Sequence, residues 1–112
     1  MEPLYSLAEL EAISDGDKAF IATMKQIFEE EMLISLDKIN GAFTNKDHNT
    51  VRVTAHTMKP SIDNLRILTI KEDIRALESM AARGAAFEEM QPVAQKVERV
   101  LHEVIADMKA TG

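Results

Sequence analysis

The stretch Val51-Arg-Val-Thr-Ala-His-Thr-Met-Lys-Pro-Ser-Ile-Asp-Asn-Leu65 decides how we interpret the rest of the chain. Its apolar residues recur every three or four positions, the spacing of one face of an α-helix: Val51, Ala55, Met58, Ile62 and Leu65. A polar series with the same spacing contains His56 and Lys59. At about 100° per residue, His56 lies roughly 140° from the centre of the apolar stripe. The pattern therefore predicts a helix, about His48 to Ile67, that presents His56 away from the core.

Pro60 is the one local conflict in this predicted helix. Because proline has no N–H, the hydrogen bond to the carbonyl of His56 is lost, and the ring crowds that turn, at a cost of about 3 kcal/mol. The segment could form two short helices broken near Lys59, or one kinked helix. The apolar stripe continues across Pro60, which favours the single kinked helix.

Length and composition exclude several classes of protein. The 112 residues are enough for one core, so we expect a single domain over residues 1–112. A formal net charge of −6 argues against a nucleic-acid partner, which needs a basic face. The absence of cysteine excludes disulfides and thiol catalysis. No apolar run approaches the ~20 residues of a membrane span, and residues 1–5 lack a signal-peptide pattern. We therefore expect a cytoplasmic monomer with no membrane association.

Start signals and apolar periodicity predict helices along the whole chain. Ser6 and Glu9 have capping-box spacing and would begin a short helix that ends near Gly16. A long helix should follow, from about Asp17 to Thr44. Its predicted core side consists of Phe20, Met24, Ile27, Phe28, Ile34, Ile39 and Phe43.

Two more helices are predicted after the His56 segment. Thr69 and Glu72 form a second capping box, and Gly84 is a plausible stop for the helix that they begin. The inward residues of that helix are Ile70, Ile74, Leu77 and Ala81. The last helix has Pro92 in or near its first turn, and its apolar residues are Val93, Val97, Val100, Leu101, Val104 and Met108. Together these helices predict an all-α fold, an up-down-up-down four-helix bundle with a short additional N-terminal helix.

The His56 segment resembles a known signature. The residues His56-Thr-Met-Lys59-Pro60-Ser61 resemble the H-x-x-K-G-S motif of histidine phosphotransfer (HPt) domains, which act in two-component phosphorelays. The segment from Leu10 to Phe20, with Gly16-Asp17 inside it, resembles the L-x-x-I-x-x-G-D-x-x-F start of the family's long helix. The chain departs from the family at Pro60 and Arg66, where glycine is usual.

The resemblance implies a phosphorelay intermediate. His56 would carry the phosphoryl group and exchange it with aspartates of response-regulator receiver domains, with a hybrid histidine kinase as a further partner. Lys59 would stabilise the charge that spreads over the transferred oxygens. The receiver would bring the aspartate and the Mg²⁺ ion, so no cofactor or metal is expected on this chain. No Gly-rich nucleotide loop is present, so we expect a transfer intermediate rather than an autonomous enzyme.

A docking surface is expected around His56. Val53 and Pro60 flank His56 on the helical wheel, and Asp63 shares its face. The family implies a contribution from Ile13 at the end of the first helix, although Ile13 could equally be a core residue. Asp63 and Arg66 could set a charge preference or simply be solvated.

A second class of function remains open from the sequence. The chain could be an adaptor, a non-catalytic helical bundle that binds protein partners without phosphotransfer. The two hypotheses differ in whether His56 is a competent nucleophile. A metal-binding bundle is disfavoured because Glu-x-x-His pairs do not occur, and His48 and His102 have no accompanying motif.

Overall fold

Helices make up almost all of residues 4–111, the part of the chain that a computed structural model describes. The elements are α1 (Ala8–Ser14), α2 (Lys18–Asn45), α3 (His48–Asn64), the 3₁₀ turn η1 (Leu68–Ile70), α4 (Lys71–Ala82) and α5 (Phe87–Thr111). Residues 1–3 and 112 of the predicted domain lie outside the described residues, as does part of the segment examined for a signal peptide.

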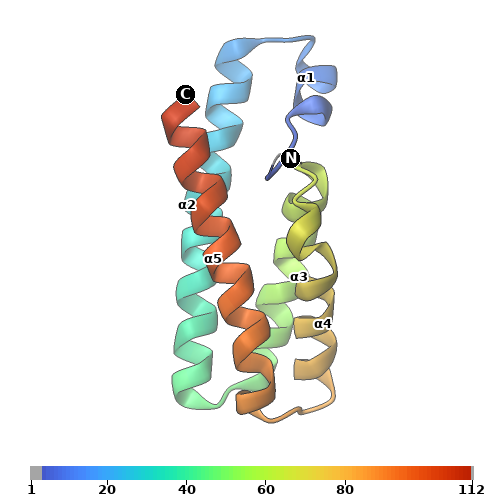
Figure 1. Ribbon diagram of the computed structural model, residues 1–112, viewed down its shortest axis with the longest axis vertical. Coiled ribbons are helices and arrows are strands. Elements are labelled where there is room, and N and C mark those ends of the chain that lie inside the picture. The colour runs from blue at the N-terminus through green and yellow to red at the C-terminus, as the bar shows by residue number, and fades with distance from the viewer. Residues whose placement is uncertain (1–3, 112) are drawn as a thin grey trace.

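The four longer helices alternate in direction along the axis of the molecule (Figure 1). Each packs against its neighbours in the chain, and α5 closes the bundle by packing against α2. The pair α3 and α4 therefore lies on the opposite side of the bundle from the pair α2 and α5. The short helix α1 lies beside the upper part of α2. The predicted four-helix bundle with an additional N-terminal helix is confirmed.

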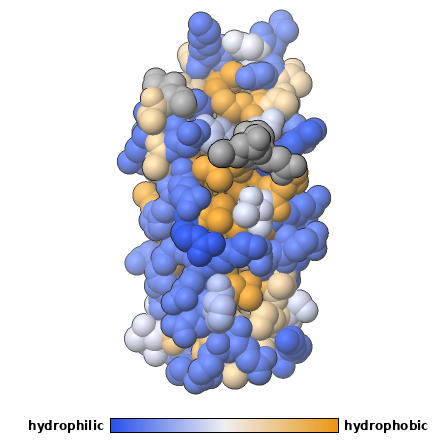
Figure 2. Space-filling model, in the orientation of Figure 1, coloured by the Kyte–Doolittle hydropathy of each residue, from blue (hydrophilic) through white to orange (hydrophobic). Residues whose placement is uncertain are grey.

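One continuous apolar core runs along the inside of the bundle. The predicted apolar faces of α3, α4 and α5 are inside: Val51, Met58, Ile62, Ile74, Leu77, Leu101 and Val104 are all fully buried. Much of the face in Figure 2 is hydrophilic, and apolar side chains reach the surface mainly along its middle. The periodicity of these three helices was thus sufficient to identify their buried sides.

The predicted core side of α2 is partly wrong. Ile34 is 57 % exposed and Ile27 is also exposed, whereas Met32 and Leu36 are buried together with Phe28 and Ile39. This helix has apolar residues on several faces, so its amphipathic pattern is weak. The prediction was therefore wrong for Ile27 and Ile34, whereas Phe20, Met24 and Phe43 pack against the core as predicted.

Side-chain caps fix the starts of two helices. The carboxylate of Asp17 accepts hydrogen bonds from the backbone N–H groups of Ala19 and Phe20, and that of Asp47 accepts from Thr50. Aspartate is favoured at this position because its carboxylate accepts from the free N–H groups of the first turn. The predicted capping box at Thr69 is wrong, because α4 follows a 3₁₀ turn and has no side-chain cap at its first residue.

The proline in α3 does not break the helix. Helical structure continues through Pro60 to Asn64, which supports the single-helix interpretation, and the helix ends three residues before the predicted Ile67. Arg66 follows with φ = 50° and turns the chain towards η1. Pro92 likewise lies inside α5, beyond its first turn. In residues 4–111, no helix is both long and apolar enough to cross a membrane.

Candidate functional site

His56 lies on the outward face of α3 with its side chain 67 % exposed. Its neighbours Ala55 and Met58 are fully buried and fix the rotation of the helix. Because the apolar stripe packs inward, the histidine must project outward. The predicted presentation of His56 away from the core matches this geometry.

A carboxylate on α4 binds both predicted site residues. Glu78 Oε2 lies 2.8 Å from His56 Nδ1, and Glu78 Oε1 lies 2.7 Å from Lys59 Nζ. Since an ionised carboxylate can only accept, the proton of the neutral imidazole is on Nδ1. No described residue forms a hydrogen bond with Nε2, so its lone pair is available at the surface.

Lys59 and His56 both stabilise the charged form of Glu78. The hydrogen bond from Lys59 is the largest cause that lowers the pKa of Glu78, and the hydrogen bond from His56 lowers it further, while partial burial opposes both. Glu78 is therefore ionised at neutral pH. Lys59 is only 25 % exposed, so its ammonium group is held close to the helix surface beside the histidine.

A second ion pair joins the same two helices. Arg75 Nη2 on α4 donates to Asp63 Oδ2 on α3 at 2.6 Å, and this hydrogen bond lowers the pKa of Asp63. Asp63 was predicted as a tentative partner-binding residue. Its carboxylate is paired with Arg75 and thereby ties α3 to α4, and its contribution to partner binding stays a prediction. Arg66 Nη2 lies 3.8 Å from Glu9 Oε1 at the surface.

The other residues that were predicted around His56 differ in exposure and in the helix that carries them. Val53 and Pro60 are exposed on the same helix as His56. Ile13 is 74 % exposed, which removes the alternative of a core residue. Ser61 points away from His56 and lines a small groove of about 120 Å³ with Leu10 of α1.

The remaining histidines differ from His56. His48 is half-buried, and its Nε2 donates to the carbonyl of Ala85 at 2.7 Å while its ring packs on Phe87. This contact joins the first residue of α3 to the loop before α5. His102 is exposed on α5. Within residues 4–111, no cluster of three metal-binding side chains is present.

Sequence reasoning missed Glu78. The sequence did contain a signal for this contact, which is the register of the two antiparallel helices. His56 precedes Ile67 by as many residues as Glu78 follows Ile67. A chain that reverses at Ile67 brings these two positions opposite each other. The expected continuation of the helix to Ile67 hid this relation.

The geometry defines a helical bundle that presents a histidine at its surface, with the Nδ1 atom bound by a carboxylate that also binds a lysine. The model of the Hpt domain family matches residues 23–111, so this chain belongs to the Hpt domain family. Membership assigns it a histidine phosphotransfer role in two-component relays, where such domains work with kinases and response regulators.

The fold agrees with a solved structure of this kind. The chain is similar to the crystal structure of histidine-containing phosphotransfer protein B (HptB) from Pseudomonas aeruginosa PAO1, with a TM-score of 0.85 and 19% identity. The likeness covers 99% of this chain and 96% of that one, so it includes the N-terminal helix α1 that the family match omits. No curated protein matches the chain in sequence.

Proposed function

We propose that this protein carries a phosphoryl group on His56 Nε2 and exchanges it with aspartates of response-regulator receiver domains. The observation that carries the proposal is the exposed imidazole whose Nδ1–H is held 2.8 Å from Glu78, which leaves the Nε2 lone pair outward. The family role supports phosphotransfer, and this geometry supports His56 as the residue that performs it.

The imidazole of His56 and the carboxylate of Glu78 are sufficient for the bond changes of this transfer. The Nε2 lone pair attacks the phosphorus of an aspartyl phosphate, a P–N bond forms, the P–O bond to the aspartate breaks, and the carboxylate leaves with the electron pair. The ring keeps its proton on Nδ1 and becomes a phosphorylated imidazolium. Its positive charge is stabilised by the carboxylate of Glu78 at the other nitrogen, so no proton acceptor in solution is needed.

Lys59 supplies a cation for the transferred oxygens. In the unphosphorylated protein its ammonium is 2.7 Å from Glu78 Oε1, and the other oxygen of the same carboxylate binds the imidazole. A flexible ammonium can move from the carboxylate towards an incoming phosphoryl group. Among residues 4–111, Glu78 is the one carboxylate bound to His56, and it is already paired with Lys59. These residues therefore do not fit a resident Mg²⁺ ion, which we expect the receiver to supply.

The docking surface proposed around His56 combines apolar and small side chains. Val53 and Pro60 are exposed on α3, and the exposed side chains of Ile13 on α1 and Ile27 on α2 lie on adjacent helices. Apolar side chains around a polar centre are typical of protein interfaces. A receiver that covered them would bring its aspartate to the outward-facing Nε2. We propose a hybrid histidine kinase as a second partner for the same surface.

The direct test is phosphorylation by phosphoramidate, followed by peptide mapping of all three histidines. We expect modification of His56 that is stable in base and labile in acid, with His102 as an exposed control and His48 as a half-buried control. The His56→Gln variant should lose the modification and all transfer from a phosphorylated receiver while its circular dichroism and melting temperature stay the same. Equal labelling of His56 and His102, with normal signalling by His56→Gln, would instead support the adaptor function.

A further inference from the structure

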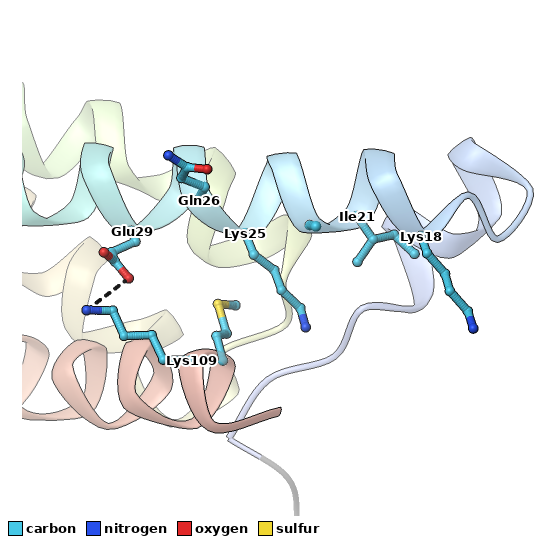
Figure 3. A pocket seen from close by; sticks show the side chains of 8 residues that line it. Lys18, Ile21, Lys25, Gln26, Glu29 and Lys109 are labelled. Carbon is cyan, nitrogen blue, oxygen red and sulfur yellow. Dashed lines mark ion pairs between the residues drawn. The ribbon is translucent and has the colours of Figure 1, made fainter. Parts of the chain in front are cut away.

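A groove of about 500 Å³ lies between the first half of α2 and the last turns of α5. Ile21 and the buried Met108 form its apolar floor, and lysines 18, 25 and 109 lie at its edges. Figure 3 shows Lys18, Ile21 and Lys25 projecting from α2 towards the space beside α5. Nothing in the proposed phosphotransfer uses this groove.

The charge of the groove is opposite to that of the whole chain. Three lysines line it against one glutamate, whereas the chain carries a net charge of −6. Lys109 Nζ lies 3.5 Å from Glu29 Oε1, but Lys18 and Lys25 form no ion pair with any residue between 4 and 111. The groove is therefore a local cationic site on an acidic protein.

The spacing of the free lysines selects an elongated ligand. Lys18 and Lys25 are seven residues apart, so they lie on one face of α2 and are separated by about 10.5 Å along its axis. One phosphate or carboxylate would have to draw both side chains together over this separation, and it would leave the apolar floor uncovered. A second helix laid along the groove has the same repeat, so acidic residues seven positions apart would face the two lysines.

The position of the groove separates it from His56. The pair α2 and α5 lies on the side of the bundle opposite to α3 and α4, where His56 and Glu78 meet. A ligand in the groove would not cover the histidine.

We propose that this groove binds an amphipathic helix of a partner protein, with acidic side chains at positions i and i+7 and apolar side chains between them. Helices commonly dock in this way, with apolar anchors in a groove and charges at its edge. Charge complementarity with Lys18 and Lys25 favours this occupant over nucleic acid, which the acidic remainder of the surface would repel. Such a tether would hold the partner while a receiver exchanges phosphate at His56.

The test measures binding of a synthetic helical peptide that has glutamates seven residues apart and leucines between them. Fluorescence anisotropy of the labelled peptide gives its affinity for the full chain, and two-dimensional NMR locates the contact. We expect the Lys18→Gln/Lys25→Gln variant to bind about tenfold more weakly, as the loss of two surface ion pairs would predict. The Lys38→Gln/Arg83→Gln variant removes the same charge outside the groove and should bind like the wild type.

Three results would overturn the proposal. The two double variants could bind with equally weakened affinity, which would mean non-specific attraction, or the NMR shifts could fall outside α2 and α5. Alternatively, sedimentation could show a dimer that Lys18→Gln/Lys25→Gln abolishes, which would assign the groove to a second copy of the chain. Labelling of His56 by phosphoramidate should be unchanged in all variants, so this test is independent of the phosphotransfer function.

Discussion

Glu78 divides its carboxylate between the two residues that the signature supplies. One oxygen accepts from His56 Nδ1 and the other from Lys59 Nζ. The first contact selects the tautomer in which Nε2 is the nucleophile, and the second keeps a cation beside it. Glu78 thus acts through His56 and Lys59, and we regard it as a positioning residue.

Removal of the Glu78 side chain should slow the labelling of His56. In Glu78→Ala the imidazole loses its acceptor and the imidazolium product loses its counter-charge, so we expect the phosphoramidate rate to fall about tenfold, as expected for one charge-assisted hydrogen bond. Glu78→Gln keeps an oxygen that can accept from Nδ1 and should recover part of the rate. The rate is followed by quench and mass spectrometry as a function of pH.

One further measurement separates this role from a purely structural one. The NMR shifts of the His56 ring nitrogens should report Nδ1–H in the wild type and in Glu78→Gln, and a mixture of tautomers in Glu78→Ala. Unchanged tautomer and rate in Glu78→Ala would show that Glu78 only joins α3 to α4.

Arg66 shows how a single residue misleads a prediction from sequence. Its replacement of the family's usual glycine suggested an effect on partners, but its backbone has φ = 50°. Glycine adopts this left-handed conformation without the steric cost that a side chain brings. The backbone conformation at Arg66 therefore serves the chain reversal after α3, in addition to any effect of its side chain at the surface.

Pro60 tests how well α3 tolerates an interior proline. The helix is continuous on both sides, and the exposed ring contributes little to the core. Pro60→Ala restores an N–H that can bond to the carbonyl of His56, so we expect the free energy of unfolding to rise by about 1–3 kcal/mol. Urea unfolding measures this change.

The matched change for Pro60 is Pro92→Ala, because Pro92 is also exposed inside a helix, α5, but far from His56. Both variants should be stabilised. Only Pro60→Ala should also change the rate of transfer with a receiver, if Pro60 is part of the docking surface. A loss of stability in Pro60→Ala would mean that the proline itself is needed for the packing of α3.

Two glycines provide a matched pair at the level of the helices. Gly41 lies inside α2, and a methyl group there would have no atom within 4 Å, whereas Gly84 follows α4 with φ = 71°. Gly41→Ala should stabilise the protein by about 1 kcal/mol through helix propensity, and Gly84→Ala should destabilise it by about 1 kcal/mol through backbone strain. Thermal unfolding gives both values, and equal signs would contradict this account.

The helices differ in how far their sequences predicted them. In α3, α4 and α5 the apolar residues occupy one stripe each, so the periodicity identified both the helix and its buried face. In α2 the apolar residues are spread around the helix, and Ile27 and Ile34 were wrongly placed inside. His56 and Lys59 share a helix and could be paired by spacing alone. The contact with Glu78 depends on where α3 ends and the chain reverses, which local patterns define poorly.

For the molecule as a whole, the two ion pairs between α3 and α4 make stability depend on acid. Hydrogen bonds from Arg75 and Lys59 lower the pKa values of Asp63 and Glu78, whose ordinary values are 3.8 and 4.5. Between the folded and unfolded pKa values the unfolded chain binds more protons, so stability falls as the pH falls. The contribution is fully present above about pH 4.5 and is lost as the pH drops through the folded values.

We therefore expect the free energy of unfolding to decrease as the pH falls below about 4.5, with a shallower decrease in Asp63→Asn/Glu78→Gln. Urea unfolding at a series of pH values measures both slopes. The control is Asp37→Asn/Glu103→Gln, which removes two exposed carboxylates that form no ion pair with the described residues and should keep the wild-type slope. The same slope in all three proteins would show that the acid sensitivity arises outside the α3–α4 pair, and the contacts of Glu78 would then matter for the histidine alone.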